Sequence, residues 1–252
     1  MNKARWSQCV LCISLLLPAW AALADAKQAK AGPPACEQVT QEDKTQLEMI
    51  GRVLAEGKAY AALAFLDAAK IDSPPAKLYR AHALRQTGQF QPASELYHQL
   101  TSTCMSGLAY QGLGLLAEMQ EQHEAATSYL RSASNLLPVD SRVRGDYGYA
   151  LMRFGDTQTA LSELLTAIEL DGNNRLAIHN LIMLMYKMGQ DEKASQIARD
   201  FNISDASLQS IRDESGMPAF KDSQRQQFSL GGCYGNTQIC TGILSPRLEV
   251  VQ

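Results

Sequence analysis

The sequence predicts an all-α solenoid, a stack of about five helical hairpins. Alanines recur in phase along the chain, because Ala93, Ala126, Ala160 and Ala194 are separated by 33, 34 and 34 residues. A period of this length is typical of helical repeats. The 252 residues are also 46% hydrophobic but only 7% aromatic. This composition suits helices rich in Ala and Leu better than a β-sandwich.

The copy at residues 141–174 shows the repeated pattern most completely. Its small, apolar and turn-forming positions are Tyr147, Gly148, Leu151, Gly155, Ala160, Leu164, Ala167 and residues 170–174. Neighbouring copies follow in register between residues 74 and 202, and a degenerate copy lies at about 43–73. The pattern resembles the tetratricopeptide repeat (TPR), which implies two antiparallel helices in each copy.

Small residues mark the places where the two helices of a copy should cross. We expect Gly114 and Gly148 to face Ala126 and Ala160. Glu121 stands where the pattern has a glycine between the two helices. Because glycine adopts positive φ more easily than other residues, the turn at Glu121 is expected to be the weaker one.

The first 24 residues predict a cleaved signal peptide. Lys3 and Arg5 precede an apolar stretch at 9–17, and residues 22–24 form a small-x-small cleavage site. We expect the mature chain to begin at Asp25, with Lys27 as the alternative. An uncleaved anchor is disfavoured, because the apolar run is shorter than the roughly 20 residues that span a bilayer. No lipid-attachment tripeptide precedes a cysteine. The chain is therefore expected to be periplasmic, with no transmembrane span.

The remaining boundaries follow from composition. Residues 25–42 are a flexible leader, 43–205 the repeat array, 206–217 a capping helix and 218–252 a cysteine-bearing tail of irregular or short β-structure. Ser204 and Asp205 predict the N-cap of the capping helix, which would lay Leu208 and Ile211 over the last hairpin.

Export places the cysteines in an oxidising compartment. Loss of the signal peptide leaves four of them, and four cysteines allow three disulfide patterns. Proximity favours Cys233–Cys240, since both lie in the tail. By elimination, Cys36 then pairs with Cys104.

Charge and motifs exclude several classes of function. Removing Lys3 and Arg5 from the 23 basic residues leaves 21, against 26 acidic ones, so a globally basic nucleic-acid surface is absent. The predicted mature chain has no Cys-x-x-Cys metal-ligand spacing, and the sequence has no phosphate-binding loop or nucleophile motif. The four histidines stand alone in the sequence: His82, His98, His123 and His179. We therefore expect no catalytic residues, no metal and no cofactor.

The resemblance to TPR proteins implies a concave groove lined by the first helix of each hairpin. The groove residues expected in the last two copies are Arg142, Tyr149, Met152, Arg153, His179, Asn180, Met183, Tyr186 and Lys187. These residue types are enriched at protein interfaces. The alternative is that Tyr149, Met183 and Tyr186 pack against neighbouring helices. The carboxylate clamp of chaperone-binding TPRs is incomplete, since Gly145 and Tyr149 replace two of its residues and only Asn180 resembles it.

Residues near the end of the array resemble the TadD-type assembly proteins of the tight-adherence (Flp) pilus. The resemblance rests on residues 179–182, 188–194 and 203–206 within a match of roughly 74–215. It implies a non-catalytic assembly factor that binds protein partners such as a secretin or a pilin. Two alternatives stay open: a general periplasmic TPR scaffold, and an enzyme whose site lies in the cysteine tail. The sequence does not predict the oligomeric state.

Overall fold

A computed structural model describes residue 36 and residues 39–216 of the chain. The predicted signal peptide, most of the leader and the tail with Cys233 and Cys240 lie outside the described residues, so these predictions stay as they were. Within the described part the secondary structure is entirely helical. Its eleven helices are α1 (Gln41–Ala55), α2 (Ala59–Ala69), α3 (Pro74–Gln86), α4 (Phe90–Leu100), α5 (Ser106–Met119), α6 (His123–Leu136), α7 (Ser141–Phe154), α8 (Thr157–Leu170), α9 (Arg175–Lys187), α10 (Asp191–Asp200) and α11 (Asp205–Gly216).

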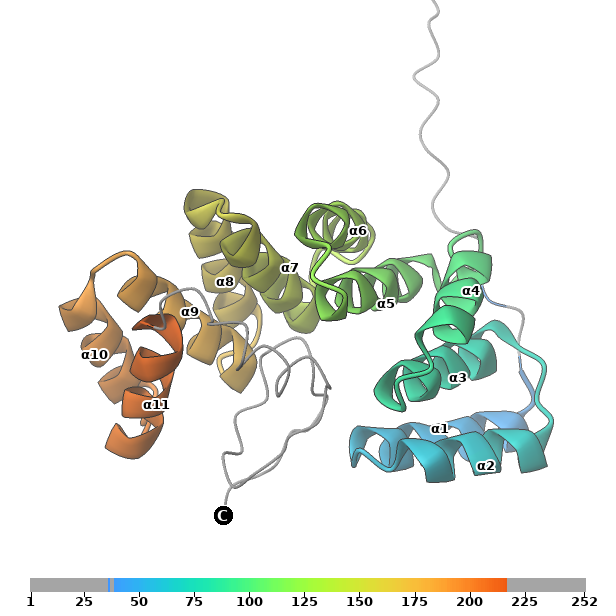
Figure 1. Cartoon of the computed structure of the whole chain (residues 1–252). Coiled ribbons are helices and arrows are strands. Elements are labelled where there is room, and N and C mark those ends of the chain that lie inside the picture. Colours follow the sequence, from blue (N-terminus) through green and yellow to red (C-terminus); the bar gives the residue numbers. More distant parts are fainter. Residues whose placement is uncertain (1–35, 37–38, 217–252) are drawn as a thin grey trace, which may run out of the picture. The chain divides into compact units, whose positions relative to one another are not determined.

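The first ten helices form five hairpins, from α1/α2 to α9/α10, and α11 follows them (Figure 1). The two helices of each hairpin pack together, and each second helix packs on the first helix of the next hairpin. This arrangement confirms the all-α repeat stack. It also explains why alanines and glycines recur along the chain, because each helix must approach two or more neighbours closely.

The turn inside each hairpin places one residue in the left-handed region. Four of these residues are glycines, with φ between 70° and 101°: Gly57, Gly88, Gly155 and Gly189. The fifth is Glu121, with φ of 60°. A side chain makes this conformation unfavourable, so Glu121 carries a strain that the other turns avoid.

Polar side chains cap the helices that begin the later copies. Asp140 accepts hydrogen bonds at Oδ1 from the backbone N–H groups of Arg142 and Val143, at 2.9 and 3.2 Å. Asn174 accepts one from Ala177 N–H at 3.0 Å, and its Nδ2 also donates to Ser141 Oγ at 2.7 Å. These contacts satisfy N–H groups that a helix start leaves without partners. The Asn174–Ser141 bond also joins consecutive copies.

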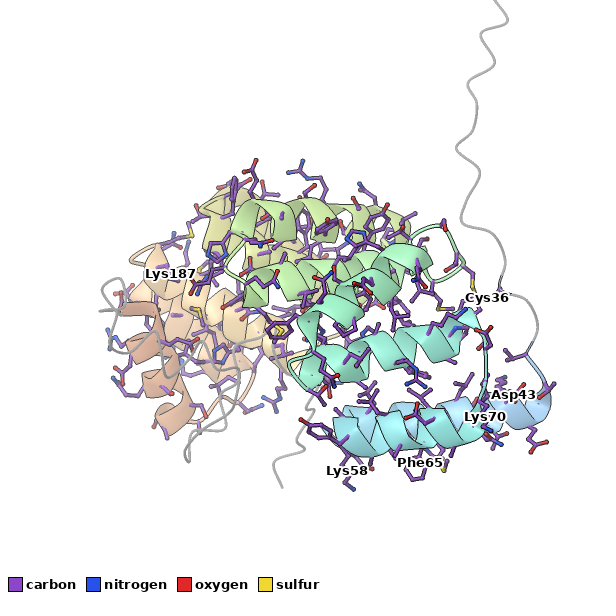
Figure 2. All side chains as sticks on the ribbon, turned by 45° about the vertical axis from the view of Figure 1, so that its right-hand side comes forward. Cys36, Asp43, Lys58, Phe65, Lys70 and Lys187 are labelled. Atoms are coloured by element: carbon purple, nitrogen blue, oxygen red, sulfur yellow. A yellow bond between two sulfur atoms is a disulfide. The ribbon has the colours of Figure 1, made fainter. Side chains whose placement is uncertain are left out.

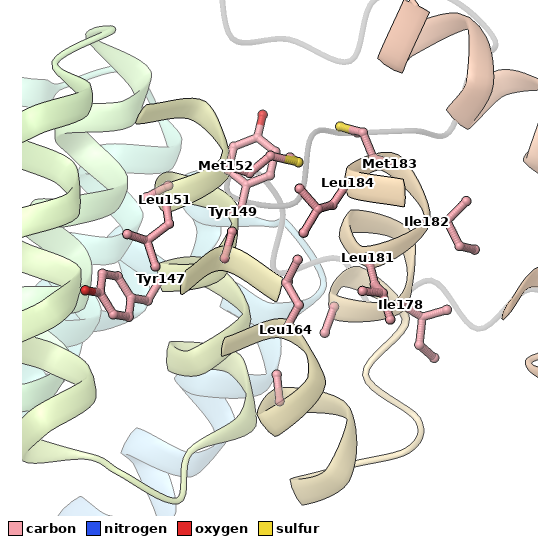
Figure 3. Packing of buried hydrophobic residues seen from close by; sticks show 14 of the residues in the cluster. Tyr147, Tyr149, Leu151, Met152, Leu164, Ile178, Leu181, Ile182, Met183 and Leu184 are labelled. Atoms are coloured by element: carbon pink, nitrogen blue, oxygen red, sulfur yellow. The ribbon is translucent and has the colours of Figure 1, made fainter. Parts of the chain in front are cut away.

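The largest core cluster runs through α7, α8 and α9 (Figure 3). A Cβ built on Gly148 would lie 2.7 Å from Leu164 Cγ, and one built on Gly114 would lie 2.5 Å from Leu130 Cγ. The two glycines therefore face leucines one helical turn beyond the alanines that the sequence suggested. The absence of a side chain at Gly148 makes room for Leu164, which is fully buried.

Helix α11 packs on α9. Ser204 Oγ accepts a hydrogen bond from Ser207 N–H at 3.2 Å, as the sequence predicted for the N-cap. Ile211 is 1% exposed, and Leu208 is half-buried against the same core cluster. The rest of the helix is held by polar contacts, among them a hydrogen-bonded ion pair between Arg212 and Asp191. Helix α11 thus adds only one fully buried side chain to the core.

A disulfide joins Cys36 to Cys104, with the two Cα atoms 5.0 Å apart. This is the pairing that the sequence predicts by elimination. The bridge holds Cys36, which lies before α1, at the turn between α4 and α5 (Figure 2). The bridge closes a loop with a sequence separation of 68 residues, which contains the first two hairpins.

Candidate protein-binding face

Side chains of the first helices meet one another across consecutive copies. Gln111 Nε2 on α5 donates to Asp146 Oδ2 on α7 at 2.7 Å, and Arg85 Nη1 on α3 lies 3.9 Å from Met119 Sδ on α5. We call the side on which these contacts lie the first-helix face. It is defined by His82, Arg85, Gln111, Glu118, Asp146, Tyr149, Arg153 and His179.

Four of the predicted groove residues are buried, with exposed fractions of 1–5%: Tyr149, Met152, Asn180 and Met183. For Tyr149 and Met183 this agrees with the packing alternative that the sequence left open. Met152 and Asn180 differ from the expectation of a surface position, because they lie within the α7–α9 region of the core. Arg142, Arg153 and Lys187 are exposed, whereas His179 and Tyr186 are half-buried.

Asn180 carries an unmet hydrogen-bonding group. Its Oδ1 is buried and has no hydrogen-bond partner in the described part of the chain. A buried acceptor without a donor typically costs about 1–3 kcal/mol. Native structures contain few such groups, and each one needs an explanation. Because this oxygen is buried, the cost belongs to the packing of the core and not to a surface that a partner reaches.

Acidic groups of α5 and α11 act on one tyrosine of α7. Glu118 is almost fully buried, and its Oε2 lies 3.1 Å from His123 Nδ1. Burial raises the pKa of Glu118, while His123 and Arg153 oppose that rise. Burial likewise raises the pKa of Tyr149 to about 12, with Arg153 opposing the rise and the charges of Glu214 and Glu118 adding to it. This end of the face therefore holds several charges within reach of one tyrosine.

The other end of the face carries a buried arginine. Arg85 is 4% exposed, and its Nε donates to Tyr97 Oη at 3.4 Å. Tyr97 Oη in turn lies 2.7 Å from His82 Nδ1. Burial, together with the positive charges of Arg85 and Arg142, lowers the pKa of His82 to about 3. His82 is therefore a neutral hydrogen-bonding group at physiological pH.

Asp146 lies between the two ends. Its burial raises the pKa of the carboxyl to about 7, although the hydrogen bond from Gln111 and the charges of Arg85 and Arg142 oppose that rise. Near neutral pH this carboxyl is therefore partly protonated. It offsets less of the positive charge around it than an ordinary aspartate would.

The sequence did not indicate that Arg85, Tyr97 and His82 lie together on this face, and it suggested that all four histidines are isolated. In the structure, His82, His123 and His179 each have a polar partner within 3.4 Å. One pair was accessible from the sequence, since Gln111 and Asp146 occupy adjacent repeat positions one copy apart. The Tyr97–His82 pair joins two helices of one hairpin through side-chain directions that the period alone does not specify.

Among the described residues, no group of three or more His, Cys, Asp or Glu side chains is arranged to hold a metal ion. None of the described helices combines the length and the apolar character that a bilayer crossing requires. What the face offers is an alternation of donors, acceptors and charges, which suits recognition of a polypeptide segment.

Comparison with known proteins places these observations in a family. No protein-family model matches the chain. The TPR repeat-containing protein PA4299 of Pseudomonas aeruginosa is 35% identical over 187 residues, which cover 71% of this chain and 76% of that protein.

Solved structures share the fold at low sequence identity. The thermophilic TPR protein TTC0263 of Thermus thermophilus is 21% identical, with a TM-score of 0.57 over 69% of this chain and 98% of that one. MamA AMB-1 is 18% identical, with a TM-score of 0.50 over 68% of this chain and 99% of that one. TPR repeat proteins are typically non-catalytic, and no enzyme family is indicated. The helical hairpins, their period and the relative in Pseudomonas aeruginosa together show that the chain belongs to the TPR repeat-containing proteins.

Proposed function

We propose that the chain is a non-catalytic adaptor whose first-helix face binds a segment of a protein partner. The observation that carries this proposal is a group of accessible side chains on the first helices of two consecutive copies, of types enriched at protein interfaces. Arg153, Tyr186 and Lys187 lie on the same two helices, α7 and α9, and remain at least partly accessible. A partner segment that brings acidic groups to the two cations and an apolar side chain to Tyr186 would complement this part of the face.

The more specific proposal is an assembly factor for a Flp/Tad-type pilus or a related secretion apparatus, working in the periplasm. It is supported by the likeness of residues 179–182, 188–194 and 203–206 to the TadD-type proteins and by the signal-peptide pattern of residues 1–24. The partners expected on this basis are pilus components such as a secretin or a pilin. A general periplasmic scaffold for another envelope complex is the alternative.

Site-specific photo-cross-linking in the source bacterium tests both levels. A photoreactive amino acid replaces Lys187 on the first-helix face, and in a matched variant it replaces Lys193, which is exposed on α10. We expect the Lys187 variant to capture pilus components and the Lys193 variant not to capture them. Capture of a different envelope complex at Lys187 would favour the general scaffold. Equal capture at both positions would contradict binding at this face.

Exposed charges on the face should contribute to binding more than to folding. Changing Arg153 and Lys187 together to Ala is expected to weaken capture of the cross-linked partner by more than about 2 kcal/mol, the size of a typical hot-spot loss. The unfolding free energy should change by less than about 0.5 kcal/mol, because both side chains are exposed. Asn180 is kept out of this variant, because its burial would mix the two effects.

Intact-mass measurement of the exported protein tests the location. We expect a chain that begins at Asp25 or Lys27 without an added acyl group. A species that retains Met1, or one that carries a lipid on a cysteine, would overturn the proposed soluble periplasmic form.

A further inference from the structure

Arg85 is a buried charge without an acidic partner. Its side chain is 4% exposed, and its two hydrogen bonds go to the hydroxyl of Tyr97 and the sulfur of Met119. In the described part of the chain, no carboxylate oxygen lies within 4.0 Å of its guanidinium. Buried charges are normally paired, because removing an ion from water is costly.

Another arginine of the array shows the usual solution. Arg144 on α7 is also largely buried, and its Nη1 donates to both carboxylate oxygens of Glu163, at 2.8 and 3.1 Å. Arg85 lies in the last turn of α3, where the helix dipole favours a positive charge. That effect offsets part of the cost of burial, but it supplies no acceptor for the remaining N–H groups.

Tyr97 and His82 lie beside Arg85 in a chain of hydrogen bonds. The charge of Arg85 also reaches the carboxyl of Asp146, which makes no ion pair with it within 4.0 Å. Tyr97 Oη already accepts from Arg85 Nε at 3.4 Å, so we assign its hydrogen to His82 Nδ1, 2.7 Å away, which is the direction that one of the two neutral ring tautomers allows. The neutral ring of His82 then carries its proton on Nε2, which has no hydrogen-bond partner among the described residues. Arg85 and His82 therefore offer N–H groups to the same part of the first-helix face.

Arg142 adds a second positive charge to this part of the face. Its charge and that of Arg85 act on the same two side chains, His82 and Asp146. The Arg142 side chain is 75% exposed, and Asp140 Oδ2 lies 3.6 Å away, a contact of the kind that contributes little in water. The guanidinium of Arg142 can therefore turn towards a bound group.

We propose that Arg85, His82 and Arg142 form a carboxylate-binding site for an acidic side chain or a C-terminus of the partner segment. A carboxylate would accept hydrogen bonds from the two arginines and from His82 Nε2, and charge-assisted bonds of this kind are stronger than neutral ones. This inference rests on the proposed binding function and names the chemistry of one end of the ligand. The site lies at the α3 end of the face, away from Asn180.

The test uses the full chain and four N-acetylated hexapeptides of the sequence Ala-Ala-Glu-Ala-Ala-Leu. The first peptide has both the Glu side chain and a free C-terminus. The second keeps only the free C-terminus, because Gln replaces Glu, and the third keeps only the Glu side chain, because its C-terminus is amidated. The fourth carries both changes and has no carboxylate. The readout is the NMR signal of Arg85 Nε–H and of the His82 ring during titration. We expect saturable shifts with at least one single-carboxylate peptide and none with the peptide that lacks both. The two single-carboxylate peptides show which source the site prefers.

Variants separate a binding role from a structural one. Arg85→Gln should weaken carboxylate binding about tenfold or more without lowering Tm, since it removes an unpaired buried charge. Because the Arg142 side chain is exposed, the Arg142→Gln variant should fold normally, and its affinity for the carboxylate peptides should fall at least about threefold. The control is Arg80→Gln on the same helix, whose native side chain pairs with Asp67 at 2.7 Å, and it should leave affinity unchanged.

Unchanged affinity in both Arg85→Gln and Arg142→Gln would overturn the site, as would a fall in Tm of Arg85→Gln with affinity retained. If Arg85→Gln fails to fold, Arg142→Gln decides alone. Inorganic phosphate that binds as tightly as the peptides would overturn the assignment to a carboxylate. If the chain without these substitutions captures a partner through Lys187 and the variants capture it equally well, this site alone is contradicted. If the chain without these substitutions captures no partner, the proposed function is contradicted.

Discussion

His179 lies against Glu214, thirty-five residues further along the chain, with ring Nε2 3.4 Å from Oε2. Gln111 and Asp146 show the same relationship, with the same separation and a donor–acceptor distance of 2.7 Å. Because the first pair joins α9 to α11 and the second joins α5 to α7, α11 occupies the place of the first helix of a sixth copy. It is a continuation of the repeat as well as a cap.

Weakening α11 should therefore loosen the end of the stack without melting its beginning. Ile211→Ala is expected to speed hydrogen exchange in α9 and α11, since Ile211 is the one side chain of α11 that is fully buried. Exchange in α1 and α2 should not change, because repeats interact mainly with their neighbours. Hydrogen exchange with mass spectrometry measures both regions in one experiment.

The control for Ile211→Ala is Gln209→Ala, an exposed change on the same helix. Equal acceleration of exchange in all helices of the array would contradict local docking of α11.

Gly148→Ala should destabilise the protein, although alanine is the better helix former. Its Cβ would lie 2.7 Å from Leu164 Cγ and 3.2 Å from the Leu164 backbone nitrogen. Overpacking of this kind typically costs about 1–3 kcal/mol, against a gain of up to about 1 kcal/mol in helix propensity. Urea unfolding monitored by circular dichroism gives the free-energy change.

Gly145→Ala is the matched control, because it lies one turn away on the same helix and its Cβ would meet Ala177 Cβ at an ordinary 3.5 Å. We expect it to be neutral or stabilising. Equal losses in both variants would show that the effect does not come from the contact with Leu164.

Glu121→Gly should stabilise the protein by about 0.5–1 kcal/mol, because a glycine relieves the left-handed backbone at φ of 60°. The other four turns already contain glycine at the equivalent position. Thermal unfolding measures the change. Glu121→Ala serves as the control, since it removes the carboxylate and keeps the Cβ. A gain in Glu121→Ala as large as in the glycine variant would indicate a charge effect instead of backbone strain.

Asp146 should make stability fall as pH rises. Its folded-state pKa is raised to about 7, so the native state holds a proton that the unfolded chain, with a carboxyl pKa of 3.8, has released. The stability that the protonated carboxyl contributes is complete below pH 3.8 and is lost by about pH 7.

Asp146→Asn removes this titration and can keep the contact with Gln111. We expect the variant to be more stable than the wild type at pH 8, and its free energy of unfolding to change less with pH between pH 4 and 7. Urea unfolding at each pH measures this free energy. The groups that face Asp146 (Gln111, Arg85, Arg142 and Asp140) are unchanged in this comparison. An equal slope in both proteins would assign the pH dependence to another residue.

Reduction of Cys36–Cys104 should lower the free energy of unfolding by about 2–4 kcal/mol, the usual contribution of a disulfide. Helicity should persist, because the hairpins carry their own cores. Peptide mapping without reduction should find this bridge and, as a separate prediction, Cys233–Cys240. Alkylation of all four thiols in the native protein would contradict both bridges.

The periodic part of the molecule was predictable from the sequence. Phased alanines and glycines indicate where helices cross and turn, and the structure places Gly155 and Gly189 in two of the five hairpin turns. The face was predictable only in part. Tyr149 and Asn180 are at groove positions of the pattern, but their burial depends on how closely neighbouring helices approach.

Arg85 illustrates what the sequence could not show. Nothing in the residues around it distinguishes a buried arginine from a solvated one. Its burial results from contacts with Tyr97 on α4 and Met119 on α5, which depend on the three-dimensional position of each side chain. Polar contacts of this kind can be identified only from the three-dimensional structure.

The Cys36–Cys104 bridge also determines how the chain carries tension. A pull on the chain before Cys36 passes through the disulfide to Cys104, in the turn before α5, and bypasses α1 to α4. The first two hairpins are therefore mechanically shielded while the bridge is intact. An array fastened to a moving machine by its N-terminal end would transmit the load from its third hairpin onward.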